Sequence, residues 1–142
     1  MKKVIFLFIL SLVISTPSVS AQKVVSMKKH KIVFHLTNND SLVHKAMVRQ
    51  INNLLTAAPN AKIEVVSHSN GIEFLMIAKT KQAASITELK NKGVVFAACE
   101  NTMRERKIDK SEILSEAIYV PSGVFEVVLK QEQKYSYIKA GN

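Results

Sequence analysis

The residue with the most distinctive chemistry is Cys99, the sole cysteine among 142 residues. It directly follows Val94 to Ala98, an apolar run that is typical of a buried strand. Thr102 and Glu105 then have the spacing of a capping box, which predicts that a helix begins at Thr102. Cys99 is therefore predicted to lie between a strand end and a helix N-terminus. The free N–H groups and the dipole of a helix N-terminus favour the thiolate, which is the reactive form of cysteine.

Charged neighbours act on this thiol in both directions. Arg104 and Arg106 are expected to lower the pKa of Cys99, whereas Glu100 is expected to raise it. A lone cysteine cannot form an internal disulfide, and free cysteines are also common as small buried core residues. Two interpretations of Cys99 therefore stay open: a reactive thiol that carries sulfur or senses oxidants, and an inert core residue.

Two histidines are candidate proton-transfer partners for Cys99, because the ordinary pKa of histidine lies near neutrality. His35 lies near the end of the first predicted strand, and His68 follows the second. The alternative is that each ring is simply satisfied by a backbone hydrogen bond. Asn101 and Thr102 could bind a small anion, and the alternative for Thr102 is capping alone.

Hydrophobic patterns and turn residues place these side chains on a regular framework. Strands alternate with helices, which predicts an α/β fold with a mostly parallel sheet and right-handed crossovers. The strands are predicted at 31–36, 61–66, 94–98 and 118–120, with a small edge strand at 137–138. Helices are predicted from Asp40 or Ser41 to Pro59, over 72–78, from the Ser85/Glu88 capping box to Gly93, from Thr102, after the Asp109/Glu112 capping box, and after Pro121-Ser122-Gly123.

In a parallel sheet, ligands bind beyond the carboxyl ends of the strands. Four of the predicted turns meet at that edge, although they are far apart in sequence. We therefore expect one cluster of polar and nucleophilic side chains there, formed by His35, His68, Cys99, Asn101 and Ser122. One cysteine and scattered histidines have no recognised metal-ligand spacing, so no metal or other cofactor is predicted.

The N-terminal segment has the features of an export signal. Residues 1–21 combine two early lysines, an apolar stretch and a Val19-Ser20-Ala21 cleavage site, which predicts a signal peptide and a periplasmic or secreted protein. The apolar stretch is shorter than the roughly 20 residues of a membrane span, so no stable membrane anchor is expected. Residues 22–30 are predicted to be a flexible lead-in to one domain over 31–142. The net charge of +9 comes from dispersed basic residues, and nucleic acid is not an expected partner.

The turns themselves resemble those of the DsrE/DsrF-like family over roughly residues 31–138. The most specific parts are Cys99-Glu-Asn-Thr102, the Arg-containing helix after it, and the Pro121-Ser-Gly123 turn. The resemblance implies a three-layer α/β sandwich, a homo-oligomer that is a trimer or hexamer, and a Cys99 that carries sulfur as a persulfide. It also implies a sulfur-transfer or redox partner. Independently of the resemblance, the candidate ligand-binding residues at the strand ends are Asn101, Thr102, Ser122 and Gly123.

Two functions follow as hypotheses. The first is an exported protein that handles sulfur or redox equivalents through Cys99, as a carrier or sensor rather than a turnover enzyme. The second is an oligomeric module that binds a small ligand or acts as a scaffold, without thiol chemistry.

Overall fold

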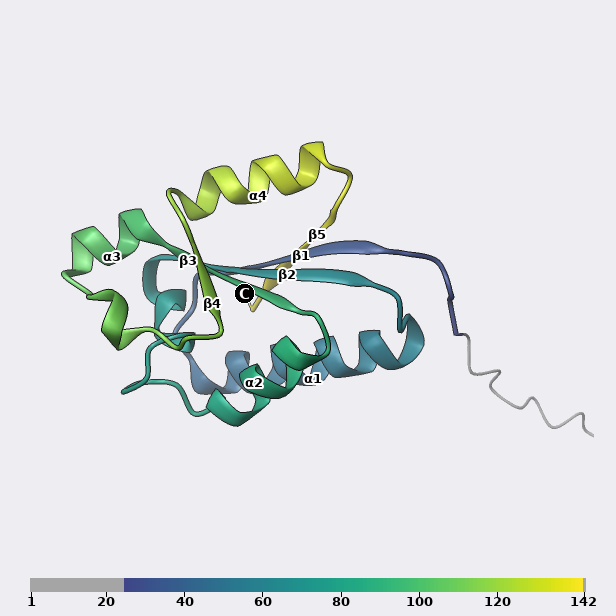
Figure 1. The fold of residues 1–142 in the computed structure, drawn as a ribbon, viewed down its shortest axis with the longest axis horizontal. Helices are drawn as coiled ribbons and strands as arrows, with labels where there is room; N and C mark the ends of the chain where they lie inside the picture. Colours follow the sequence, from purple (N-terminus) through teal and green to yellow (C-terminus); the bar gives the residue numbers. More distant parts are fainter. Residues whose placement is uncertain (1–24, 142) are drawn as a thin grey trace, which may run out of the picture.

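The computed structural model describes residues 25–141, and the predicted signal peptide lies outside them. Five parallel strands form one sheet in the order β4-β3-β2-β1-β5. Figure 1 shows α1 and α2 on one side of the sheet and α4 on the other. The predicted three-layer α/β sandwich is confirmed. The elements are β1 (Lys31–Leu36), α1 (Ser41–Ala57), β2 (Lys62–Ser67), the 3-10 helix η1 (Ser69–Phe74), α2 (Ala83–Asn91), β3 (Val95–Cys99), α3 (Glu100–Arg106), the 3-10 helix η2 (Lys110–Glu112), β4 (Ala117–Val120), α4 (Gly123–Glu132) and β5 (Ser136–Ala140).

The chain order explains why α4 lies apart from α1 and α2. Strands β1 to β4 are added one after another in a single direction across the sheet, and the chain then returns past β1 to place β5 at the opposite edge. Because parallel crossovers are right-handed, reversing the direction places the connecting helix on the opposite face.

The two faces of the sheet are packed very differently. The α1/α2 side holds the main core, whose largest side chains include Phe34, Phe74 and Phe96. The α4 side holds only a small apolar cluster of Val33, Val66, Ala97, Val120 and Val127. The outward-facing row on α4 consists of exposed apolar side chains, Val124, Phe125 and Val128.

Three local predictions were wrong. The segment 72–78 is not an α-helix; residues 69–74 form the 3-10 helix η1. Gly71 within η1 packs so tightly on the Leu36 backbone that a Cβ atom there would lie 2.2 Å from its carbonyl oxygen. Helix α2 begins at Ala83 without the predicted Ser85 cap. Helix α3 begins at Glu100 rather than Thr102, and Cys99 itself occupies the N-cap position. The Asp109/Glu112 capping box is confirmed.

The segment before β1 runs against the end of α1. The Ser26 N–H donates to the Ala57 carbonyl at 2.7 Å, and the Asn60 side chain donates to the Met27 carbonyl at 2.9 Å. Residues 25–30 of the expected lead-in are therefore hydrogen-bonded to the domain.

Candidate functional site

Cys99 is the last residue of β3, and the chain enters α3 at the next residue. Its side chain is buried, with 4% of the residue surface exposed. Two backbone N–H groups donate to its sulfur, that of Gly123 at 3.1 Å and that of Thr102 at 3.5 Å. The sulfur therefore accepts hydrogen bonds from the first turns of both α3 and α4.

Glycine at position 123 makes this arrangement possible. A Cβ atom on Gly123 would lie 2.9 Å from the Cβ of His68 and 3.2 Å from the Cβ of Cys99. The neighbouring Ser122 caps α4, since its hydroxyl accepts from the Phe125 N–H at 3.3 Å. The predicted Pro-Ser-Gly turn thus caps the helix and also allows its backbone to approach the thiol.

The environment of the thiol favours the charged form. Burial raises the pKa of Cys99, but hydrogen bonds from the Thr102 backbone and hydroxyl, with those from the Gly123 and Asn101 backbone, more than offset it. The net result is a pKa below the ordinary value of cysteine.

The charged neighbours do not act as expected from the sequence. Arg104 donates to the side chain of Asn101, and Arg106 pairs with Glu73 at 2.7 Å. Glu100 pairs with Lys110 at 3.0 Å. The pKa of Cys99 is lowered by the predicted backbone N–H groups and by the Thr102 hydroxyl, while the two arginines bind other partners.

The two candidate histidines lie side by side at the carboxyl ends of β1 and β2. Their Nε2 atoms are 2.5 Å apart, and their rings stack with centroids 4.7 Å apart. Burial lowers the pKa of both rings, and the charges of His68 and Lys139 lower that of His35 further. Both rings are therefore neutral at neutral pH, which is the form that accepts a proton.

A small cavity of about 210 Å³ opens between His68 and Cys99. Asn101, Thr102, Ser122 and Gly123 are among its lining residues, while His35 stands behind His68 and outside the lining. The structure therefore brings the seven predicted site residues together at one edge of the sheet. A larger hollow of about 540 Å³ beside α3 shares no lining residue with this cavity.

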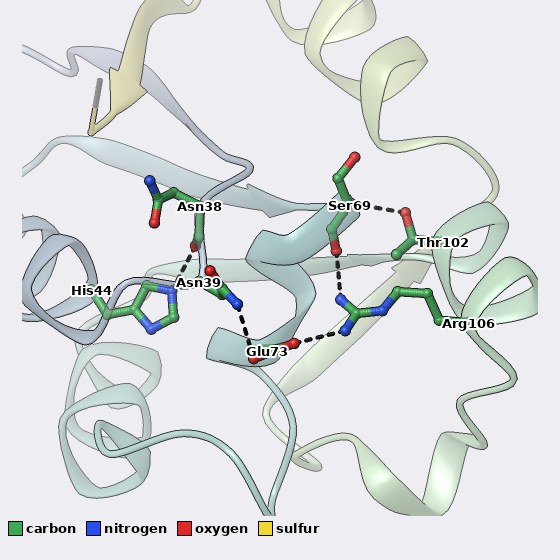
Figure 2. A network of polar contacts seen from close by, with 7 residues as sticks. All are labelled: Asn38, Asn39, His44, Ser69, Glu73, Thr102 and Arg106. Atoms are coloured by element: carbon green, nitrogen blue, oxygen red, sulfur yellow. Dashed lines mark hydrogen bonds and ion pairs between the residues drawn. The ribbon is translucent and has the colours of Figure 1, made fainter.

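Thr102 has a different role from the predicted cap. Its hydroxyl accepts from the Ser69 N–H at 3.0 Å, which joins α3 to the turn that carries His68. Arg106 donates to the Ser69 carbonyl at 3.1 Å and to Glu73 at 2.7 Å, as Figure 2 shows. The pKa of Glu73 is lowered mainly by this bond to Arg106.

These contacts fix Ser69 in an uncommon backbone conformation. Its φ of 50° lies in the left-handed region, which non-glycine residues adopt only when neighbours hold them there. Asn39 extends the network by donating to Glu73 at 3.5 Å, and His44 donates to the Asn38 carbonyl at 2.8 Å in the β1–α1 loop (Figure 2). Sequence reasoning missed Ser69 and placed Arg106 beside Cys99 instead, because the partners of both residues lie more than 30 residues away in the chain.

Within residues 25–141, no group of three or more His, Cys, Asp or Glu side chains is close enough together to hold a metal ion. Across the same described range, no helix has the length and apolar character that a membrane span requires.

The family is shown by comparison with known proteins. A sequence model of the DsrE/DsrF-like family matches residues 30–140. Because this match covers most of the sequence, the chain belongs to the DsrE/DsrF-like family, as the turns predicted. No curated protein matches the chain.

A solved structure supports the same assignment. The protein of unknown function MTH1491 from Methanobacterium thermoautotrophicum is 30% identical in sequence, with a TM-score of 0.74. The match covers 78% of this chain and 99% of that protein. The family and the fold are thereby established together.

Proposed function

We propose that this DsrE-like protein carries sulfane sulfur on Cys99, as a persulfide, between a donor and an acceptor protein. The observation that supports the proposal most is the pair of N–H groups, from Gly123 and Thr102, that donate to the Cys99 sulfur. They stabilise a thiolate, so the sulfur is a nucleophile near neutral pH.

The transfer step needs no redox reagent. The Cys99 thiolate attacks the outer sulfur of a donor persulfide, R–S–SH. A new S–S bond forms at Cys99 while the donor S–S bond breaks, and the donor leaves as the thiolate R–S⁻. Cys99 then bears the –S–SH group, and the same exchange in reverse passes the sulfur to an acceptor thiolate.

The cavity supplies what this exchange requires. At about 210 Å³ it accommodates the terminal sulfur and a few atoms of the donor cysteine. His68 lines the cavity and, with His35 behind it, can hold or return a proton as thiol and thiolate interchange. Asn101 and Ser122 offer polar side chains to the incoming group.

The test measures alkylation and persulfide loading on the folded protein. We expect iodoacetamide to label wild-type Cys99 at pH values below those needed for a free thiol. We also expect that incubation with a low-molecular-weight persulfide adds the mass of one sulfur, which cyanide or dithiothreitol removes. Cys99→Ser is the matched control and takes up neither label nor sulfur. A thiol that reacts only after denaturation would overturn the proposal.

The burial of Cys99 favours a second candidate function. With 4% of its surface exposed, the sulfur could be part of the wall of a binding site, in an oligomer that holds a small ligand or serves as a scaffold. Native mass spectrometry distinguishes this function from sulfur carriage, because a binding module keeps its bound ligand, seen as added mass, in the Cys99→Ser variant as well.

We also propose that the protein assembles as a homo-oligomer, a trimer or a multiple of it, through the outer face of α4. Val124, Phe125 and Val128 are exposed on that face, and Val124 also lines the Cys99 cavity. Covering the row with a second copy would remove apolar surface from water and stabilise both subunits.

Export is a further part of the proposal. We propose cleavage after Ala21, so that the mature chain begins at Gln22 in the periplasm or outside the cell. N-terminal sequencing of the protein from the periplasmic or culture fraction tests this, and a full-length chain confined to the cytoplasm would contradict it.

A further inference from the structure

A chain of four hydrogen-bonded side chains crosses the edge of the sheet next to the Cys99 cavity. The Tyr137 hydroxyl on β5 lies 2.8 Å from Nδ1 of His35 on β1. Nε2 of His35 then lies 2.5 Å from Nε2 of His68, and Nδ1 of His68 lies 3.0 Å from the Ser69 hydroxyl. Every ring nitrogen of the two histidines therefore has a polar partner. Tyr137 is exposed to solvent, whereas His68 lines the cavity.

The contact between the two rings fixes how many protons they hold. Two Nε2 atoms this close must share one hydrogen, because two lone pairs or two N–H groups facing each other repel. The Nδ1 atom of each ring can hold a hydrogen or be without one, since the Tyr137 and Ser69 hydroxyls that face them can each donate or accept. The pair therefore exists as a neutral form and as a form with one positive charge. A second charge requires that the two rings separate.

We infer that His35 and His68 share a proton and titrate as one unit beside the Cys99 cavity, with Tyr137 and Ser69 as the positioning residues at its two ends. The use of this proton at Cys99 rests on the proposed function, whereas the sharing itself rests on the geometry. Tyr137 links the unit to solvent, so protons reach the cavity without passing through its mouth.

The charged groups around the pair are few. Lys139 on β5 is the register partner of His35 and opposes a positive charge on it. Cys99 and Glu105 of the α3 region share the cavity lining with His68, and their negative forms favour that charge. From α4, the cavity receives the uncharged residues Gly123 and Val124.

The acidic and basic groups of α4 are engaged elsewhere. Lys130 lies between Glu64 on β2 at 2.6 Å and Glu126 at 3.2 Å. On η1 and α3, Glu73 and Arg106 neutralise each other at 2.7 Å. The protonation state of the pair is therefore governed by burial, by Lys139, by the Cys99 and Glu105 groups in the cavity lining, and by the hydroxyls at its ends.

The position of Ser69 is itself determined by the network of Figure 2. Thr102 accepts from its N–H and Arg106 donates to its carbonyl, which holds its left-handed backbone. Because Thr102 also donates its N–H to Cys99, one residue links the end of the histidine chain to the thiol. A change in the protonation of the histidine pair can therefore affect the thiol through two contacts, the Ser69–Thr102 hydrogen bond and the Thr102 N–H that donates to Cys99.

The test is a histidine titration by NMR of the ¹⁵N-labelled full mature chain. We expect His35 and His68 to change together over one pH range and to take up one proton between them. His68→Asn should restore a complete, independent titration of His35. Two independent titrations of one proton each in the wild type would overturn the inference.

The role of Tyr137, at the solvent end of the hydrogen-bonded chain, is tested with a matched pair of tyrosine variants. Tyr137→Phe removes the hydroxyl that accepts from charged His35, so the shared titration should move to lower pH. Tyr119→Phe is the control, because the Tyr119 hydroxyl donates to the Lys110 carbonyl at 3.3 Å, away from both rings. Equal titrations in the two variants would overturn the role of Tyr137.

The use of the shared proton at the thiol is read from the pH profile of Cys99 alkylation. We expect a step in the wild-type profile at the pH of the shared titration, and we expect Tyr137→Phe to move that step with it. A folded protein without labelling at any pH refutes the proposed thiol function and this use of the proton, while the NMR titration separately decides the proton sharing.

Discussion

The backbone N–H of Gly123 lies 3.1 Å from the sulfur of Cys99, so the first residue of α4 is hydrogen-bonded to the last residue of β3. The two residues are 24 positions apart in the sequence. Because a Cβ atom at position 123 would lie 3.2 Å from the Cβ of Cys99, a side chain there forces α4 away from the thiol.

Gly123→Ala should therefore weaken both the fold and the thiolate. We expect the free energy of unfolding to fall by about 1–3 kcal/mol, as for other overpacked sites. Loss of the N–H bond raises the pKa of Cys99, and alkylation at neutral pH should slow by up to about tenfold. Urea unfolding and iodoacetamide kinetics measure the two effects. The control is Gln131→Ala, at an exposed position of the same helix outside the apolar row; equal behaviour of the two variants would count against the hydrogen bond.

The ion pair between Glu64 and Lys130 holds the other end of α4 on the sheet. Glu64 is 3% exposed, and its Oε2 lies 2.6 Å from Lys130 Nζ while Oε1 has no hydrogen-bond partner. Burial raises the pKa of Glu64, and the bond to Lys130 opposes that rise. Lys130→Met should destabilise the fold by about 3 kcal/mol, because it leaves a buried carboxylate without its cation.

Two further variants check the cause of that loss. Adding Glu64→Gln to Lys130→Met should recover most of the lost stability, since the buried charge is then gone. Lys92→Met removes the exposed pair with Glu88 and should cost less than about 1 kcal/mol. If Lys130→Met lowers the free energy of unfolding in urea no more than Lys92→Met does, the buried ion pair does not stabilise the fold.

The histidine pair makes the stability depend on pH. Both rings have a pKa lowered from 6.5, so the unfolded chain takes up protons before the folded chain does. Their contribution to the free energy of unfolding is therefore complete above 6.5 and is lost as the pH falls through 6.5 toward the lowered values. The pKa values of Glu73 and Glu116 are lowered from 4.5, so these carboxylates change the free energy of unfolding only at more acidic pH.

The measurement is the difference in unfolding free energy between wild type and a variant with both His35→Asn and His68→Asn. Taking this difference cancels the contribution of Glu64, whose raised pKa makes the stability change with pH in the opposite direction. We expect the wild type to lose stability relative to the variant as the pH falls below 6.5. A difference that stays constant with pH would show that the two rings are not held neutral by the fold.

The exposed apolar row on α4 leads to a prediction about assembly. Phe125 is 59% exposed at the centre of this row. Phe125→Asp should dissociate the oligomer to a monomer, because burying an unpaired carboxylate in an apolar interface is costly. Leu42→Asp is the control, since Leu42 is exposed on α1 on the opposite side of the sheet. Light scattering at micromolar concentration measures the mass, and a wild-type monomer would contradict the proposal.

Local sequence patterns were sufficient for most of the framework. The predicted bounds of β1, 31–36, are those observed, and the Asp109/Glu112 box caps η2 as predicted. Both depend on residues close together in the chain, where hydrophobic runs and caps act within one or two turns. The general rule that ligand sites lie at the carboxyl ends of parallel strands then correctly placed His35, His68 and Cys99 at one edge.

Tertiary structure decided the contacts that give these residues their chemistry. The partner of His35 at the outer end is Tyr137, which is 102 positions away and reaches it only because β5 pairs with β1. Arg106 appeared to be a neighbour of Cys99 but binds Glu73 across the fold. A short segment of sequence fixes its own backbone preferences. Hydrogen bonds between distant segments depend instead on strand order and register, which arise only when the whole sheet has formed.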